Sequence, residues 1–382
     1  MSSVAPLAFI PAPAARPTPV YAAPGAVTGG QLLIELLHDH RSSPHVLIAD
    51  EQVHNLFGES VVSRLRAADL DVRVLLVPAG ESTKSADVYL RLVGETLDSG
   101  VDKGSHVLTL GGGVTSNVGG FVAATVFRGL PLIHLPSSLM AQLDAAIDVR
   151  QAINHERGKN LIGAMYAPKA VIIDPQLLTT LPLRHLRSGM AEAIKHALTQ
   201  SAAFARELHA NAHRLTDAAQ LDSVVRATLR WKMKLLKRAA MRDLAELHLQ
   251  YGHCIGHAIE TASSYALLHG EAIAIGMAVS ARIAAALGIC GSDVVRDHLD
   301  LLLAYGLPVD LPPDVNAAAV IEAATRDKNA IRQVPRLALP RKTGRIHRAE
   351  GDGFVSIDTD VLLCYLLGAR ADCRGDAQPP YG

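Results

Sequence analysis

Three histidines in a short apolar stretch have the residue type and spacing best suited to chemistry. His253 and His257 lie four residues apart, so a helix would place them on one face, one turn from each other. His269 follows beside Gly270, where the pattern predicts a turn and then a second apolar helix. Neutral imidazole is a common ligand of zinc-like ions. The spacing therefore permits either a metal site or hydrogen-bonded histidines of the core.

A second group of polar residues lies on another apolar helical stretch. Glu192, Lys195 and His196 occur together in the sequence GMAEAIKHAL. Glu192 and Lys195 are three residues apart, which is the spacing of an ordinary ion pair on a helix surface. A carboxylate on an otherwise apolar helix could equally complete a His/His/Glu set of metal ligands.

A glycine turn follows one of the apolar strand patterns. Residues 106–113 read as a strand that runs into three glycines and then into a helical pattern, a setting in which backbone N–H groups can approach a pyrophosphate. Ser116 replaces the third glycine of the dinucleotide fingerprint, and glycines also serve close packing without a ligand. Asp50 ends one further strand pattern, and residues 80–84 follow another. The glycine turn, Asp50 and residues 80–84 could therefore line one ligand crevice at the strand ends.

Residues 128–160 contain an unusual density of polar and charged side chains. The run 151–163 lacks helical periodicity and is predicted to be a long loop. Such a loop is often simply solvated. Beside a glycine turn, its arginine and lysine side chains would suit phosphate recognition.

The order of the predicted elements indicates two domains. Strand and helix patterns alternate through the first 175 residues, which predicts an α/β domain with a mostly parallel sheet. From about residue 178 helical periodicity dominates, and only 336–342 suggests extended structure. The predicted strands are 45–50, 71–80, 106–113, 130–138 and 170–175. The predicted division is a flexible Ala/Pro-rich tail over 1–27, an α/β domain over 28–177 and a mainly α-helical domain over 178–382.

Composition excludes several classes of protein. Of the 382 residues, 49% are hydrophobic and 19% are charged, as in a globular chain. The formal net charge is zero, which argues against a nucleic-acid or membrane-surface binder, and no apolar run reaches the roughly 20 residues of a membrane span. Four irregularly spaced cysteines and an N-terminus without a basic signal region predict a reduced, cytoplasmic protein.

Several of these stretches together resemble one known family, the sugar phosphate cyclases, which includes dehydroquinate synthase and 2-deoxy-scyllo-inosose synthase. The order and spacing of the matching motifs agree over roughly residues 40–300. The motifs are GGGVTSNVGGF (111–121), FRG (127–129), LPSSLMAQLD (135–144), QAIN and GKNLIG (within 151–163), GMAEAIKHAL (189–198), and YGHCIGHAIE and LHGEAIAIGM (within 251–277).

The resemblance implies a fold and a reaction. The fold would be a nucleotide-binding α/β domain followed by a helical metal domain, with the active site between them. A bound NAD would be reduced and then reoxidised within one turnover, and one divalent ion, zinc or cobalt, would hold substrate hydroxyls. The sugar phosphate would lose its phosphate by elimination and close to a carbocyclic ketone, as in a carbon–oxygen lyase acting on phosphates.

Residues that match the family's motifs take its roles only by resemblance. The metal ligands would be Glu192, His253 and His269, and His257 would belong to the proton-transfer network. Lys195, Arg150 and Lys159 would complete the catalytic set. Substrate would be bound by Asp144, Asn160, Lys232, Gln250 and Arg128, the last from the neighbouring subunit of a homodimer. NAD would contact Asp50, Glu81, Lys84, Gly112, Gly113, Asn117, Ser137 and Ser138.

Several departures indicate which cyclase the chain resembles more closely. Asn117, Tyr251 and the run 151–154 are more similar to the 2-deoxy-scyllo-inosose synthases than to dehydroquinate synthase, and Gln250 replaces an asparagine that is usual in the family. Glu246 stands where dehydroquinate synthase has a substrate-binding arginine, and an acid there would repel an anionic substrate. The resemblance therefore favours a 2-deoxy-scyllo-inosose synthase-like cyclase acting on glucose 6-phosphate or a related hexose or heptose phosphate, in secondary metabolism such as antibiotic biosynthesis.

Three alternatives stay open at this point. Within the family, the chain could be a 3-dehydroquinate or aminodehydroquinate synthase. From another class, it could be an iron-type NAD-dependent alcohol dehydrogenase with similarly arranged domains. Arg150 and Asn329 replace lysines of the family pattern, and these changes are compatible with a binding protein that has lost catalysis.

Overall fold

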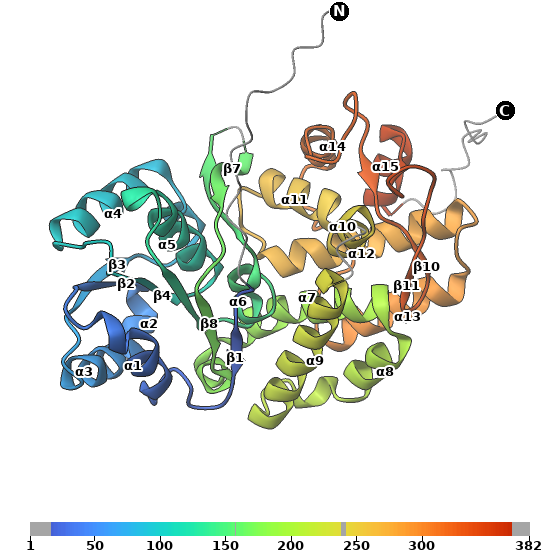
Figure 1. Cartoon of the computed structure of the whole chain (residues 1–382). Helices are drawn as coiled ribbons and strands as arrows, with labels where there is room; N and C mark the ends of the chain where they lie inside the picture. Colours follow the sequence, from blue (N-terminus) through green and yellow to red (C-terminus); the bar gives the residue numbers. More distant parts are fainter. Residues whose placement is uncertain (1–16, 157, 238–241, 369–382) are drawn as a thin grey trace, which may run out of the picture.

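The chain folds into two lobes that lie side by side (Figure 1). The computed structural model describes residues 17–156, 158–237 and 242–368. The N-terminal lobe, coloured blue to green, is built on a sheet, and the lobe that follows, coloured yellow-green to red, is mainly helical (Figure 1). This arrangement confirms the predicted fold class. The division at residue 177 stays a proposal: the sheet ends with β8 (Ala170–Ile173), and the first long helix of the second lobe, α7, begins at Leu183.

A six-stranded sheet forms the centre of the N-terminal lobe, with strand order β1-β8-β5-β4-β2-β3 and parallel pairing throughout. All five predicted strands are present. The strands are β1 (Val20–Ala22), β2 (His45–Asp50), β3 (Val72–Val77), β4 (Val107–Gly111), β5 (Leu132–Pro136) and β8.

Helices cover both faces of this sheet, which explains why its strands read as continuous apolar runs. On one face, Leu47 packs in a core with side chains of α1 and α3. On the other face, Val46 and Ile48 pack with side chains of α4 and α5. The helices are α1 (Gln31–Leu37), α2 (Glu51–Val53), α3 (Glu59–Ala67), α4 (Ala86–Asp98), α5 (Gly113–Thr125) and α6 (Leu139–Leu143).

The expectation of a flexible tail over 1–27 is wrong for the described part of that segment. Val20–Ala22 forms the edge strand β1, paired in parallel with β8. The buried carboxylate of Asp174 then accepts hydrogen bonds from the backbone N–H groups of Gly25, at 2.9 Å, and Val27, at 3.2 Å. These contacts reach about 150 residues along the chain, so no local pattern could reveal them. Residues 1–16 lie outside the described part.

The predicted long loop over 151–163 is instead a hairpin of β6 (Arg150–His155) and β7 (Gly158–Met165). Gln151 and Ile153 of β6 are buried, whereas most of β7 is exposed. Neither strand therefore carries a regular apolar alternation, and the local pattern resembles a loop. The hairpin stands at the side of the sheet lobe that faces α11 (Figure 1).

The second lobe is a group of packed helices with a few short strands. Helix α7 is buried along almost its whole length, from Ser188 to Thr199. Two-stranded pairs β10–β11 and β9–β12 confirm the extended structure predicted near 336–342. The elements are α7 (Leu183–Gln200), α8 (Ala202–Ala210), α9 (Ala218–Lys237), α10 (Arg242–Leu249), α11 (His253–Ala262), α12 (His269–Ala286), α13 (Ser292–Ala304), α14 (Ala317–Ala324), β9 (Arg336–Leu337), β10 (Pro340–Lys342), β11 (Arg345–Ile346), β12 (Val355–Ser356) and α15 (Thr359–Leu366).

Two further expectations concern the environment of the chain. No helix in the described part combines the length and apolarity that a membrane crossing requires. Among the described cysteines, Cys254 and Cys290 are free thiols, but Cys364 is disulfide-bonded, so the expectation of a reduced chain is wrong for Cys364.

Candidate metal and nucleotide site

The structure brings the three predicted metal ligands together. Glu192 lies in the middle of α7, and His253 and His269 are the first residues of α11 and α12. Oε1 of Glu192 lies 3.5 Å from Nε2 of His253 and 4.0 Å from Nε2 of His269. The ligand atoms of the three residues all lie within 4.8 Å of one another, which is close enough for one ion to contact all three.

Glycines allow the two histidine-bearing helices to meet. Gly252 precedes α11 with φ at 79°, a conformation that side chains disfavour, and a Cβ there would lie 2.6 Å from Cγ of Met277 in α12. A Cβ on Gly276 would lie 2.1 Å from the carbonyl oxygen of Gly252. The backbones of α11 and α12 therefore approach too closely for any larger residue at these positions, and this approach brings His253 near His269.

Hydrogen bonds orient both imidazole rings toward Glu192. Nδ1 of His253 lies 3.1 Å from the carbonyl oxygen of Tyr251, and Nδ1 of His269 lies 3.0 Å from Oε2 of Glu260. If each Nδ1 carries the proton and donates it, each Nε2 keeps its lone pair facing Glu192. Oε1 of Glu192 is buried and has no hydrogen-bond partner among the described residues. A buried carboxylate oxygen without a donor, facing two imidazole lone pairs, fits a divalent cation.

The two histidines are electrostatically different. Burial, with a smaller contribution from Lys195, lowers the pKa of His253 well below its usual value. Burial also opposes protonation of His269, but the carboxylate of Glu260 outweighs it and raises the pKa of that ring. A metal cation would compete with the proton that His269 takes up when its ring becomes charged. Metal binding is therefore expected to weaken in acid.

A second possible ligand group consists of His257, Glu260 and His269. It fits an ion less well, because its carboxylate already has partners. Glu260 bonds Lys159 through Oε1 at 2.7 Å and His269 through Oε2 at 3.0 Å. Nδ1 of His257 lies 3.6 Å from a carboxylate oxygen of Asp327. His257 lies one helical turn from His253 and beside the carboxylate of Asp327, in a position suited to proton transfer.

Buried lysines surround the metal group. Nζ of Lys195 lies 2.5 Å from Oε2 of Glu192, and both side chains are almost fully buried, so this is not the surface pair that the spacing alone allowed. Nζ of Lys232 lies 2.6 Å from Oδ1 of Asp144. Burial would raise the pKa of Asp144, but Lys232 and Lys195 outweigh it and hold that pKa well below its usual range.

Lys159 and its neighbours connect the hairpin to both lobes. Nζ of Lys159 lies 2.7 Å from Oε1 of Glu260 in α11 and 3.3 Å from Oε1 of Glu81 after β3. Burial opposes the charge on Lys159, but these two carboxylates raise its pKa. Nζ of Lys84 donates to the side-chain oxygen of Asn160, and burial lowers the pKa of Lys84 to about 8.

The predicted nucleotide residues lie at or after the carboxyl ends of four adjacent strands, β5, β4, β2 and β3. The chain passes from β2 outward to β3 and then returns to β4 on the other side of β2. In parallel sheets a crevice opens at such a reversal, and ligands bind there. Gly112 and Gly113 begin α5 at this point, with no side chain capping the helix, so its first N–H groups can receive an anion.

Side chains around this crevice also have local structural roles. Asp50 caps α2 by accepting from the N–H groups of Gln52 and Val53. Asn117 donates to the carbonyl of Gly113 at 2.9 Å, and Ser138 caps α6. Ser137, next to Ser138, is buried. Each group is therefore held in place, as a preformed binding surface requires.

One predicted catalytic residue, Arg150, and two predicted substrate residues have a different setting. Arg150 bonds Asp148 with its Nε at 2.7 Å. Gln250 is buried, and its Oε1 lies 3.4 Å from the side-chain nitrogen of Asn329. Arg128 is exposed after α5 with φ at 62°, and no ion pair is found for it in the described ranges. Its predicted contact from a neighbouring subunit stays untested in a single chain.

Glu260 was not predicted as a site residue, although it holds both Lys159 and His269. It lies seven residues after His253 on α11, and two helical turns bring it to the same side of the helix. That spacing was the available signal. A buried acid at this distance from a histidine ligand is a candidate partner for a neighbouring ligand.

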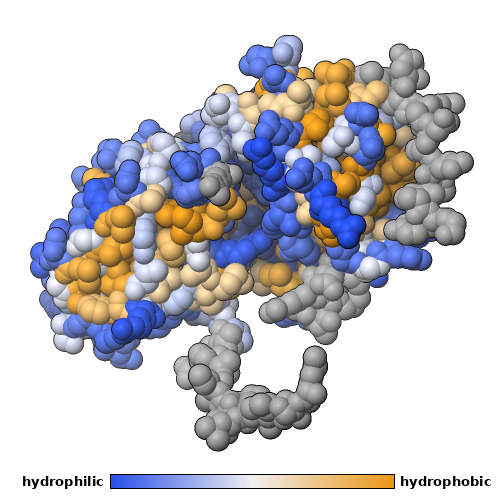
Figure 2. All heavy atoms as spheres, turned by 90° about the horizontal axis from the view of Figure 1, so that it is seen from above, coloured by the Kyte–Doolittle hydropathy of each residue, from blue (hydrophilic) through white to orange (hydrophobic). Residues whose placement is uncertain are grey.

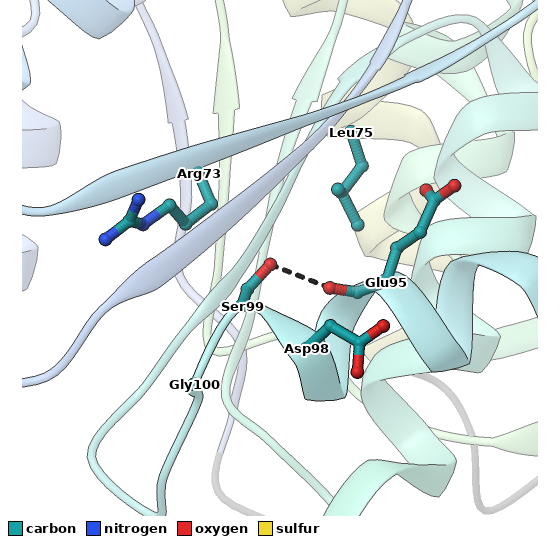
Figure 3. A pocket seen from close by; sticks show the side chains of 6 residues that line it. All are labelled: Arg73, Leu75, Glu95, Asp98, Ser99 and Gly100. Atoms are coloured by element: carbon teal, nitrogen blue, oxygen red, sulfur yellow. Dashed lines mark hydrogen bonds between the residues drawn. The ribbon is translucent and has the colours of Figure 1, made fainter.

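The space-filling view shows the surface between the two lobes. Seen from above, a hollowed strip of mostly hydrophilic residues separates the two lobes (Figure 2). A shallow pocket elsewhere, lined by Arg73, Leu75, Glu95 and Asp98, lies between β3 and α4 (Figure 3). It sits toward the amino end of β3 and the carboxyl end of α4, away from the strand ends that form the crevice, so it is separate from the site.

Fold and site together define a two-lobed protein with a nucleotide crevice in a parallel sheet and a three-ligand metal group in the facing helices. The comparisons with known proteins agree. Residues 74–188 match the family model described as 3-dehydroquinate synthase N-terminal, and residues 189–330 match the model described as 3-dehydroquinate synthase C-terminal. The chain belongs to the 3-dehydroquinate synthase family, which consists of phosphate-eliminating cyclases.

Individual relatives place the chain among these cyclases. It is 37% identical over 304 residues to 3-dehydroquinate synthase of Desulforamulus reducens, covering 79% of this chain and 85% of the relative. Its fold matches 2-epi-5-epi-valiolone synthase of Streptomyces hygroscopicus, solved with NAD+ and Zn2+, with a TM-score of 0.83 and 26% identity over 94% of this chain and 98% of the other. It also matches 2-deoxy-scyllo-inosose synthase in complex with NAD+ and Co2+, with a TM-score of 0.81 and 24% identity over 91% and 95% of the two chains.

Proposed function

We propose that this protein is a sugar phosphate cyclase that uses bound NAD and one divalent ion to convert a sugar phosphate into a carbocyclic ketone with loss of phosphate. The observation that carries the proposal is the Glu192, His253 and His269 group within 4.8 Å. The group belongs to the helical lobe, and a hydrophilic hollow lies between this lobe and the sheet lobe (Figure 2). Family membership supports the same reaction class and separates the chain from alcohol dehydrogenases.

The chain's own residues would hold the substrate and move its protons. In this reaction NAD supplies a reversible hydride acceptor, and the ion polarises a substrate hydroxyl. Lys195 and Lys232 would place positive charge beside the substrate in a buried site, where charge interactions are strong. His257, paired with Asp327, would take and return a proton. Because the hydride returns to the product, the reaction yields phosphate and no net NADH.

For the substrate, the sequence relatives now favour the 3-dehydroquinate synthase alternative over the 2-deoxy-scyllo-inosose synthase expectation. Relatives of 34–38% identity carry the name 3-dehydroquinate synthase. Similarity over most of the chain supports this substrate class more strongly than a few single-residue departures support the other. The leading proposal is therefore a cyclase of the 3-dehydroquinate synthase type, acting on a carboxylated seven-carbon sugar phosphate.

One observation keeps a hexose phosphate as the second candidate. Burial opposes the charge on Arg150, but Asp148 and then Asp144 and Glu246 raise its pKa, so carboxylates surround this guanidinium. Glu246 itself pairs with Lys328 at 3.1 Å. These cations are therefore already neutralised. A carboxylated substrate would need a free cation here, whereas a polyol body with a single phosphate would not.

Phosphate release from a substrate panel tests the proposal. The panel contains glucose 6-phosphate and heptose phosphates with and without a carboxylate, each incubated with the protein, NAD and zinc or cobalt. Release with no net NADH supports a cyclase, and the preferred substrate distinguishes the two candidates. NADH accumulation without phosphate release would indicate a dehydrogenase, and no reaction with any member of the panel would contradict the proposal.

The remaining expectations stay proposals. A homodimer would allow Arg128 to reach a neighbouring subunit's substrate, and light scattering of the purified protein tests this. We also propose a cytoplasmic location, which the composition supports, and a role in antibiotic biosynthesis, which the resemblance supports. Zinc and cobalt both suit one carboxylate and two imidazoles, so the bound ion must be measured by elemental analysis.

A further inference from the structure

We propose that Glu260 is a positioning residue that joins the metal site to the nucleotide crevice, so that binding of a divalent ion and binding of NAD favour each other. The inference rests on the proposed function for its two ligands. It adds a coupling between their sites, and that coupling can be measured without turnover.

Glu260 makes a different contact with each of its two oxygens. Oε2 lies 3.0 Å from Nδ1 of His269, whose Nε2 faces Glu192. Oε1 lies 2.7 Å from Nζ of Lys159. The Glu260 side chain is 2% exposed, so neither contact is strongly screened by water. One buried carboxylate therefore holds a metal ligand of the helical lobe and a lysine of the hairpin.

The contacts continue from Lys159 into the sheet lobe. Nζ of Lys159 also lies 3.3 Å from Oε1 of Glu81, which accepts from the side-chain nitrogen of Asn154 at 2.8 Å. The backbone N–H of Asn154 bonds the carbonyl of Lys84 at 2.8 Å. Glu81 and Lys84 follow β3, at the edge where the nucleotide crevice opens. A continuous set of ionic and hydrogen-bonded contacts thus runs from His269 to the crevice.

Each ligand would order one end of this set. An ion on His269 fixes the ring and, through Nδ1, the carboxylate of Glu260. A dinucleotide in the crevice fixes Glu81 and, through it, Lys159. Once one end is ordered, the other ligand loses less conformational entropy when it binds, which gives positive coupling. Coupling is reciprocal, and typical values correspond to a change of about 5-fold to 150-fold in affinity.

The cross-lobe part of the proposal is tested by measuring NAD affinity calorimetrically on the metal-free full chain, with and without saturating zinc. The wild-type protein should bind NAD at least about 5-fold more tightly with zinc. Glu260→Gln and Lys159→Met each remove the charge pair between the lobes, and each should bring this ratio close to one. A wild-type ratio near one, an absence of NAD binding, or an unchanged ratio in both variants would overturn the coupling.

A matched control uses another carboxylate close to the same histidine. Glu271 lies two residues from His269 and pairs with Arg184 at 2.7 Å. Glu271 is on α12 and Arg184 is on α7, so this ion pair lies within the helical lobe and does not connect the two lobes. Glu271→Gln should therefore keep the wild-type ratio. Loss of the ratio in this variant as well would show a general effect of removing charge near His269 and would contradict a specific role of Glu260.

The positioning of His269 has its own measurement, the visible spectrum and affinity of bound Co2+. Glu260→Ala removes the acceptor of Nδ1–H and should weaken Co2+ binding about 10-fold to 100-fold with a changed spectrum. Glu260→Gln retains an oxygen acceptor and should restore most of the affinity. Wild-type affinity and spectrum in Glu260→Ala would overturn the positioning role. A protein that shows the coupling but releases no phosphate would contradict only the proposed function.

Discussion

The two lobes contribute different chemical groups to the site. The sheet lobe offers the carboxyl ends of parallel strands, the first N–H groups of α5 and short polar side chains that cap local helices. The helical lobe offers buried carboxylates and lysines, namely Glu192, Lys195, Lys232 and Glu260. The sheet lobe has fewer buried charges: among the described residues they are Asp174, which backbone N–H groups hold, and Lys84, whereas its buried His134 and the partner Thr109 are neutral.

This difference indicates how each lobe should respond to substitution. Backbone donors at a strand end depend on the fold and not on one side chain, so most single changes in the crevice should leave it formed. Buried charges depend on their partners, because removing one partner leaves an uncompensated charge in a poorly solvated place. Changes in the helical lobe should therefore have the larger effects.

The largest expected effect is at the metal group. His253→Ala and His269→Ala should each lose bound zinc and lower turnover by at least about a hundredfold. Removal of a hydrogen-bond partner of a metal ligand already lowers metal affinity or activity about 10-fold to 100-fold, and removal of the ligand itself should cost more. His257→Ala should lose turnover but keep the ion, because His257 is not in the group with Glu192. Elemental analysis of the three purified variants checks this. Zinc lost from His257→Ala and kept by His253→Ala would place the ion in the other ligand group.

The next effect concerns the ion pair between the lobes that joins buried Lys232 to half-buried Asp144. Lys232→Met leaves the carboxylate of Asp144 without its closest cation, and we expect the free energy of unfolding to fall by roughly 3 kcal/mol. Arg226 pairs with Asp222 on the same helix α9 but is solvent-exposed. The control Arg226→Gln should change stability by less than about 0.5 kcal/mol. Equal effects in urea unfolding would contradict the contrast between buried and exposed charge.

The smallest effect belongs to the sheet lobe and depends on pH. Burial lowers the pKa of His134 from 6.5 to about 3, so the folded state keeps this ring neutral while the unfolded chain takes up a proton below pH 6.5. Stability is therefore lost as pH falls from 6.5 toward 3, by about 1.4 kcal/mol per pH unit for this group. His134→Gln should reduce the loss in urea unfolding between pH 7 and pH 5.

A control for this measurement is His209→Gln, at an exposed position on α8. It should leave the difference between the two pH values as in the wild-type protein. If His134→Gln also leaves that difference unchanged, the buried imidazole of the sheet lobe does not contribute to acid instability.

Local patterns were sufficient for five of the six strands of the sheet and for the helical character of the second lobe. The apolar run 45–50 predicts a strand that is buried on both faces. The four-residue spacing of His253 and His257 predicts that they share one face of a helix. Both predictions depend only on neighbouring residues and local backbone geometry. The roles of Glu192 and His269 came from position within matching motifs and not from spacing.

Contacts between distant segments could not be obtained in this way. The edge strand Val20–Ala22, the hairpin over 150–165, the burial of Lys195 against Glu192 and the contacts of Glu260 all depend on which segments pack against each other. Glu260 and Lys159 are 101 residues apart, and either one alone reads as an ordinary surface charge. Their pairing exists because folding brings the hairpin and α11 together and buries Glu260, and a buried carboxylate requires a partner.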